Sequence, residues 1–90
     1  MSRTIVTLVG KDHVGIIAAV CNFFADNNIN ILDIKQTTVQ DYINMILIVD
    51  TSGYQQGFDM LNEGLQQVGE KVGCIIKATH EEIFEMMHRI

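Results

Sequence analysis

The run from Ile43 to Val49 reads Ile-Asn-Met-Ile-Leu-Ile-Val, and it constrains the fold more than any other segment of this chain. Successive residues of a strand point to opposite faces of a sheet. Met45 and Leu47 therefore share one face, while Ile46 and Ile48 share the other. A half-covered antiparallel sheet alternates apolar with polar residues. This strand instead predicts a sheet whose second face is also buried, by another copy of the chain or by a C-terminal helix.

Two kinds of segment alternate along the 90 residues. Runs of β-branched residues bounded by turn residues predict strands, and apolar residues that recur every three or four positions predict helices. The chain therefore reads strand, helix, strand, strand, helix, strand, followed by a short terminal helix. The strands are expected over residues 3–9, 29–39, 43–49 and 74–78, and the helices over residues 17–24, 58–72 and 79–90.

This order of elements is that of the split βαβ arrangement, the ferredoxin-like α+β fold. Right-handed crossovers put both long helices on one face of its antiparallel sheet. A chain of 90 residues has room for one domain. We therefore expect a single βαββαβ domain over residues 1–90, with a helical extension at residues 79–90.

Polar residues mark the expected helix starts. Asp12 is a candidate N-cap of the first helix, because a carboxylate can accept the unpaired N–H groups of a first turn. Ser52 with Gln55 has the spacing of a capping box before the second helix, and Thr79 with Glu82 repeats it before the terminal one. The stripe expected to pack the first helix onto the sheet consists of Ile17, Val20, Cys21 and Phe24.

The composition excludes several classes of function. Six basic and eleven acidic residues give a net charge of −5, and the basic residues form no cluster, which argues against a nucleic-acid or anionic-membrane surface. The longest wholly apolar run, Ile16–Cys21, is far shorter than the ~20 residues of a membrane span. The N-terminus lacks the pattern of a signal peptide, so a cytoplasmic location is expected. Cys21 and Cys74 are expected to be buried thiols rather than a disulfide.

Side chains suited to catalysis or metal binding are few. No serine lies in a Gly-x-Ser-x-Gly turn, and neither cysteine has a histidine nearby in the sequence. His80 and His88 would lie ~12 Å apart along one helix, too far to share a metal. The chain is therefore predicted to be non-enzymatic, without cofactor or metal. A small hydrolase that uses Asp12 and His13 is the weakest alternative.

The turn from Gly10 to Gly15 is the strongest candidate for a binding site. It leads into a helix whose first N–H groups have no intrahelical partner, and such an end attracts carboxylate or phosphate. Asp12 could cap this helix or receive an ammonium group, and a capped helix start without a ligand is the plainer alternative. His13 is either an inert loop histidine or a carboxylate ligand. Asp33 is either a solvated strand residue or part of a cleft beside this turn.

Residues 9–16 (Val-Gly-Lys-Asp-His-Val-Gly-Ile) and 28–34 (Asn-Ile-Asn-Ile-Leu-Asp-Ile) resemble an ACT domain, the small regulatory module of amino-acid metabolism. Residues 80–84 and 87–90 resemble the tail of a family of short, stand-alone bacterial and archaeal ACT proteins without an assigned function. That family is similar to the ACT modules of the glycine cleavage system repressor and of formyltetrahydrofolate deformylase.

The resemblance implies a homodimer that binds an amino acid or a similar small metabolite at its interface. The ligand-binding residues would be Asp12, His13, Val14 and Gly15, with Asn30 and Ile31 opposite. The predicted function is therefore non-catalytic sensing of a metabolite, passed on to a metabolic enzyme or regulator. The alternative is a ligand-free interaction module that docks onto another protein through residues 83–90.

Overall fold

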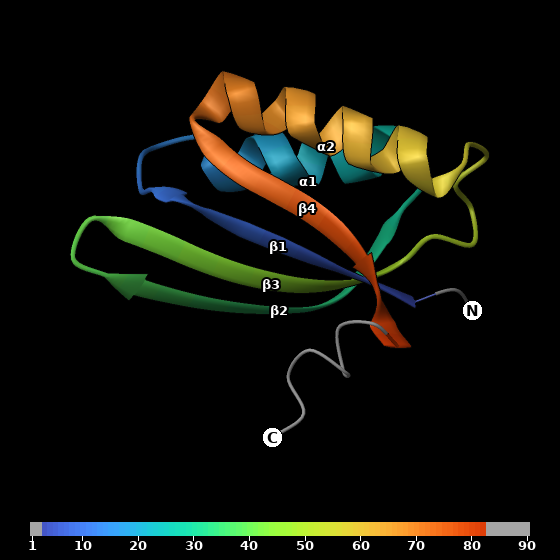
Figure 1. Ribbon diagram of the computed structural model, residues 1–90, viewed down its shortest axis with the longest axis horizontal. Coiled ribbons are helices and arrows are strands. Elements are labelled where there is room, and N and C mark those ends of the chain that lie inside the picture. The colour runs from blue at the N-terminus through green and yellow to red at the C-terminus, as the bar shows by residue number, and fades with distance from the viewer. Residues whose placement is uncertain (1–2, 83–90) are drawn as a thin grey trace.

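The computed structural model describes residues 3–82, which form a four-stranded antiparallel sheet with two helices on one face (Figure 1). The order of the strands across the sheet is β2-β3-β1-β4. This is the predicted ferredoxin-like α+β fold. Its elements are β1 (Arg3–Lys11), α1 (Ile16–Asp26), β2 (Asn30–Val39), β3 (Tyr42–Asp50), α2 (Phe58–Val72) and β4 (Cys74–His80).

The pairing of the strands places β1 in the interior of the sheet and leaves β2 and β4 at its edges. Val6 of β1 lies opposite Leu47 of β3 on one side and Ala78 of β4 on the other. The β2–β3 hairpin turns at Gln40, whose φ of 54° is left-handed. A bulge shifts the register between Ile31 and Asp33, so β2 is irregular where it enters the sheet.

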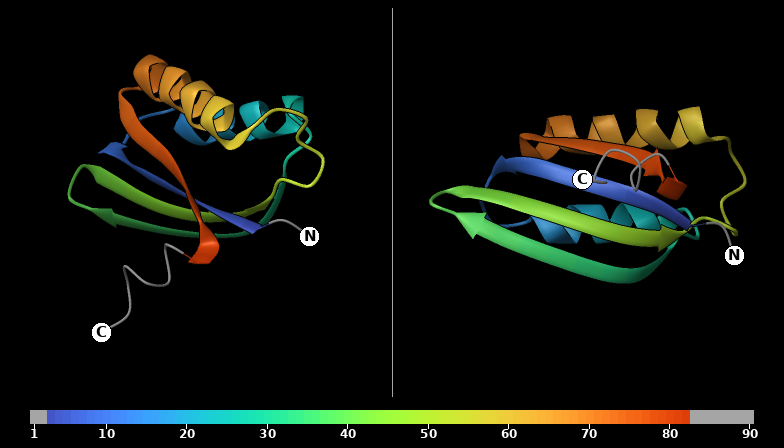
Figure 2. Two further views of the ribbon diagram at one scale, coloured as in Figure 1. Left: turned by 45° about the vertical axis from the view of Figure 1, so that its right-hand side comes forward. Right: turned by 60° about the horizontal axis from the view of Figure 1, so that its bottom comes forward.

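The core lies between the sheet and the helices, which share one side of it in both views of Figure 2. Val6, Leu47 and Leu65 are fully buried there. The buried stripe of α1 differs from the predicted one: Ile16 takes the place of Ile17, which is 43% exposed. Successive residues of a helix are about 100° apart around its axis. The predicted stripe was therefore rotated away from the face of α1 that is buried. The buried residues of α1 are Ile16, Val20 and Phe24.

The predicted helix caps are wrong. α1 begins after Gly15, in a left-handed conformation with φ 99°, and no side chain caps it. α2 begins after Gly57, again without a side-chain cap. Ser52 instead donates from its hydroxyl to the Asp50 carboxylate, with an Oγ to Oδ1 distance of 2.6 Å. β4 continues through His80, so Thr79 belongs to a strand. Residues 83–90 of the predicted terminal helix lie outside the described residues.

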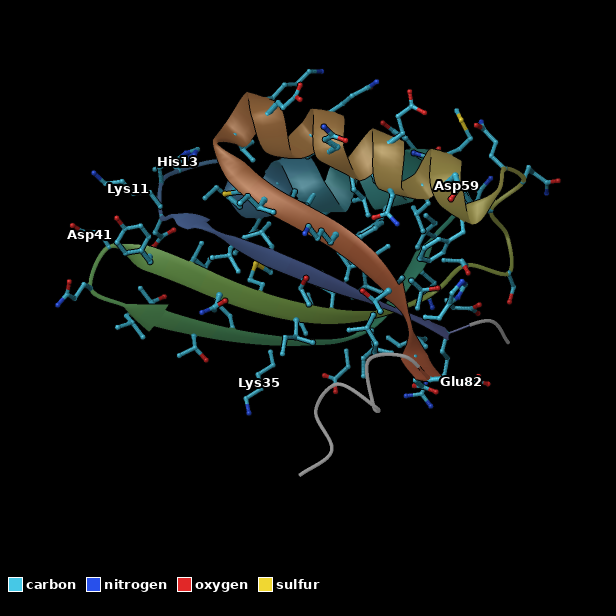
Figure 3. The ribbon with its side chains drawn as sticks, viewed as in Figure 1. Lys11, His13, Lys35, Asp41, Asp59 and Glu82 are labelled. Carbon is cyan, nitrogen blue, oxygen red and sulfur yellow. The ribbon has the colours of Figure 1, made fainter. Side chains whose placement is uncertain are left out.

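The face of the sheet that points away from the helices is apolar at its centre. Ile5 is only 3% exposed, and Ile46 and Ile48 are partly buried. Toward the edge this face becomes polar, and Lys35 of β2 extends from it into solvent (Figure 3). That a second copy or the C-terminal residues cover this face stays a prediction. Within residues 3–82, neither helix is long and apolar enough to cross a membrane.

Gly69 allows α2 to rest directly on the start of β4. A Cβ atom at this position would overlap the backbone carbonyl oxygen of Cys74. Alanine is ordinarily favoured over glycine inside a helix by about 1 kcal/mol. We expect Gly69→Ala to reverse that sign and lower the free energy of unfolding by about 1–3 kcal/mol, because a backbone atom cannot yield to the new methyl group. Urea denaturation measures the change.

The matched control is Gly57→Ala. A Cβ atom at Gly57 would meet nothing within 4 Å, and its φ of −76° suits alanine. Its effect should stay within about 0.5 kcal/mol. A Gly69→Ala variant as stable as the unmodified protein would show that α2 does not rest on this carbonyl.

Candidate functional site

The turn between β1 and α1 is held against the β2–β3 hairpin. The N–H of Asp12 donates to the carbonyl of Asp41 at 2.7 Å. Lys11, His13 and Asp41 accordingly lie at the same end of the sheet, and Asp59 lies at the other (Figure 3). The turn thus has a defined place between the hairpin and the helix layer.

His13 links this turn to the end of α2. Its Nε2 lies within hydrogen-bonding distance of the carbonyl of Val72, the last residue of α2. Its Nδ1 lies 3.0 Å from the carbonyl of Val14. Both ring nitrogens can donate only in the imidazolium form. The Val72 carbonyl, followed by the Val14 carbonyl, therefore raises the pKa of His13 above its ordinary value of 6.5, and the nearby Asp12 adds to the rise.

The start of α1 remains open for an anion. No side chain caps its N-terminus, and its first turn contains no acidic residue. Val14, just before the helix, is 99% exposed. The unpaired N–H groups and the positive end of the helix dipole attract a carboxylate. Since Asp12 does not cap the helix, its exposed carboxylate can face a ligand's ammonium group.

The remaining predicted site residues lie on β2. Asn30 is exposed at the first position of the strand, and Ile31 is partly buried beside the core. Asp33 follows the bulge and is exposed, and its Oδ1 accepts the N–H of Ile34 at 2.9 Å. Asp33 is solvent-exposed in the single chain, and a place for it in a ligand-binding cleft stays a prediction.

A single chain does not bring the two halves of the predicted site together. Lys11 pairs with Tyr42 at one end of β3, whereas Asn30 pairs with Asp50 at the other. The 11 residues of α1 lie between the two groups, which corresponds to about 16 Å at 1.5 Å per residue. The expectation that Asn30 and Ile31 lie opposite the turn is therefore not met within one chain.

An exposed apolar flank runs along the β2 side of α1. Phe23 lies against α2, because a Cβ atom at Gly64 would come within 2.8 Å of its ring. Ile17 and Cys21 lie around the helix on the opposite side, toward β2. Ile34 of β2 shares the face of Leu47 yet is 43% exposed, because no helix within residues 3–82 covers it.

Sequence reasoning missed this flank. The wholly apolar run Ile16–Cys21 could have indicated it. A helix that is apolar around its whole circumference must be buried on more than one side. We define the α1–β2 flank as Ile17 and Cys21 of α1 with Leu32 and Ile34 of β2. Ile17, Leu32 and Ile34 are exposed, and Cys21 is partly buried.

The titratable side chains near the turn offer little reactivity. Cys21 and Cys74 are both free thiols. Burial raises the pKa of the Cys74 thiol, and the negative charge of Asp12 raises it further, so its reactive thiolate is disfavoured at neutral pH. His80 lies on β4 and stacks on Phe58 with a centroid distance of 4.1 Å. Within residues 3–82, no group of His, Cys, Asp or Glu side chains could hold a metal ion.

The sequence matches known proteins over its whole length. The model of the ACT domain family matches residues 4–59, more than half of the chain. A UPF0237 protein of Bifidobacterium longum is 43% identical over 90 residues, and the match covers 100% of each chain. The expected relationship to short ACT-domain proteins is thereby confirmed.

Solved structures match the fold as well. An ACT domain protein from Streptococcus pneumoniae has a TM-score of 0.81 at 33% identity, with 93% of this chain and 94% of that chain covered. A formyltetrahydrofolate deformylase from Pseudomonas syringae has a TM-score of 0.78 at 22% identity, with 88% of this chain and 28% of that chain covered. The second match shows a shared fold.

His13 should keep its proton to a higher pH than an isolated histidine. The folded protein then binds the proton more tightly than the unfolded chain does. The contact of His13 with Val72 therefore stabilises the fold fully below pH 6.5, the ordinary pKa of histidine. Its contribution is lost as the pH rises through the raised pKa. We expect His13→Gln to be more destabilising at about pH 5.5 than at about pH 9. NMR titration of the imidazole, assigned by its absence in this variant, measures the pKa. A pKa at or below the ordinary value would contradict the contact with Val72.

Proposed function

The chain belongs to the UPF0237 family of ACT-domain proteins, and from that premise we propose that it is a cytoplasmic, non-catalytic homodimer that senses an amino acid or a similar metabolite. The ligand sits between the two copies and reports to a partner protein. The observation that carries the proposal is the separation of Asp12–Gly15 from Asn30 within one chain. Only a second copy can complete a site that uses both.

A two-fold axis beside β2 brings the two groups together. Two β2 strands related by such an axis run antiparallel, so the Asn30 end of one lies beside the Val39 end of the other. Val39 pairs with Tyr42, which pairs with Lys11. The Asn30 of one copy therefore approaches the end of the sheet that holds the other copy's Asp12–Gly15 turn.

The apolar α1–β2 flank supports this arrangement. In the two-fold dimer, Ile34 lies midway along β2 and faces the Ile34 of the other copy near the axis. Ile17 lies near the start of α1 and faces the Asn30 end of the other copy's β2. Exposed apolar groups at one flank are what an association surface requires. Association there would also pair the open edge of β2, which an isolated chain leaves to solvent.

The chemistry of the proposed site suits an amino acid. The N–H groups at the start of α1 receive the carboxylate. The Asp12 carboxylate or the Asn30 side-chain oxygen of the other copy accepts from the ammonium group. Because the ligand touches both copies, it favours the dimer, and the population shifts toward the state that a partner protein recognises.

A charge placed in the flank should break the dimer. We expect Ile17→Glu to convert the protein to a monomer, because the dimer would bury one unpaired carboxylate at each end of its interface. Analytical ultracentrifugation measures the mass. The matched control is Met60→Glu on α2, where the original side chain is 48% exposed, close to the 43% of Ile17. A dimer that survives Ile17→Glu, or an unmodified protein that is monomeric at every concentration, would overturn this geometry.

Mixing two defective variants tests whether each site uses both copies. Calorimetric titration with the proteinogenic amino acids at about 1 mM first identifies the ligand. Asp12→Asn and Asn30→Ala should each weaken its binding about tenfold or more, because each removes a polar contact to a charged group. After subunit exchange of equal amounts, about half of the dimers are mixed, and each mixed dimer regains one intact site.

Recovery of about a quarter of the tight sites is therefore expected. No recovery would contradict a site shared between the two copies, and silence across the whole panel would contradict the sensing of amino acids.

A further inference from the structure

Asn62 of α2 occupies part of the open edge of β4. Its side-chain Nδ2 donates to the carbonyl of Ala78 at 3.1 Å, and its Oδ1 accepts the N–H of Ala78 at 2.8 Å. A carboxamide thus forms the same pair of bonds that a neighbouring strand would form with Ala78. The backbone of Ala78 therefore points out of the sheet, away from β1.

Ile76 presents the same backbone groups without a partner. The β1–β4 register runs without a break from Thr4–His80 to Gly10–Cys74. Residues two apart on a strand point their N–H and C=O groups the same way, so those of Ile76 also point out of the sheet. No hydrogen bond within residues 3–82 engages them. One unpaired residue of strand edge thus remains beside Asn62.

These two groups open into a groove of about 620 Å³ between α2 and β4. Asn62, Gln66 and Glu70 form its helical wall, and they are spaced four residues apart on one side of α2. At the far end, α2 closes onto β4 where Gly69 meets the carbonyl of Cys74. One side of the groove therefore offers the backbone N–H and C=O of Ile76, and Glu70 makes its Cys74 end acidic. The strand edge is covered on either side of Ile76, by Asn62 at Ala78 and by Gly69 at Cys74.

We propose that this groove binds a short extended peptide, which adds to the edge of β4 through one residue paired with Ile76. Asn62 shows that the same edge accepts an amide two residues away, at Ala78. Two charged residues set the preferred sequence. Glu70 lies in the helical wall at the Cys74 end, and Lys77 lies on β4 with its side chain on the face away from the helices.

The alternation of side chains along a strand gives the order of residues in the peptide. In a peptide antiparallel to β4, the residue paired with Ile76 lies beside Gln66. The next residue lies over Ile75, which is 66% exposed and apolar. The third residue leaves the strand edge where α2 meets Cys74, so its side chain lies near Glu70 and should be basic. The residue before the paired one lies near Lys77 and should be acidic. The matching probe is acetyl-Glu-Thr-Val-Lys-amide.

The experiment is an NMR titration of the full-length protein with this probe. We expect the largest shift at the Ile76 amide, and hydrogen exchange of that amide should slow on binding, because it gains a partner. Acetyl-Lys-Thr-Val-Glu-amide, with the same composition and reversed charges, should bind at least about fivefold more weakly. A probe methylated on the threonine nitrogen should bind about tenfold more weakly, because it loses the bond to the Ile76 carbonyl.

Two variants separate the groove from general charge effects. Glu70→Gln should weaken binding of the probe about threefold. Glu63→Gln removes the same charge from an exposed position of α2 that does not line the groove, and should leave binding unchanged. An unaltered Ile76 amide, equal binding of the reversed probe, or shifts confined to the Asp12–Gly15 turn would overturn the proposal. The groove lies at the opposite edge of the sheet from β2, so the outcome is independent of whether the dimer senses an amino acid.

Discussion

The antiparallel pairing of β1 with both β3 and β4 is the constraint on which this structure depends. Because β1 is bonded on both sides, its side chains at Val6 and Leu8 lie beneath the helices with no exposure. The same pairing leaves β2 and β4 as the two edges. Unpaired backbone groups at an edge are the usual starting point for association, so the places where this domain can bind are set by the order of its strands.

The helices cover the two edge strands to different extents. α2 rests on β4 through Gly69 and Asn62, and between these two contacts the backbone of Ile76 is left open in the described part of the chain. α1 packs on the core without reaching across β2, so Ile34 remains exposed although it faces the helix layer. One edge is thereby suited to a short ligand, and the other to a large apolar partner such as a second copy.

The strand and helix order could be predicted because apolar periodicity reflects burial directly. The helix expected over residues 58–72 is α2, whose Leu61 and Leu65 are buried and which ends at Gly73 with a φ of 71°. The caps predicted at Asp12 and Ser52 are absent. A capping motif records only that a side chain can reach a nearby backbone N–H. Here α2 begins after Gly57, several residues beyond Ser52, and the Ser52 hydroxyl donates to Asp50. The turn was found from its glycines, but its link from His13 to Val72 joins residues 59 positions apart.

The sequence by itself determined the fold, the order of its elements and the apolar character of both faces of β3, because these follow from the spacing of side chains along the chain. The tertiary structure alone decided which side of α1 is buried, that Asn62 covers Ala78, and that the turn lies away from Asn30. Each of these depends on the angle and distance between elements. Local periodicity carries no record of those quantities, since packing between distant segments sets them.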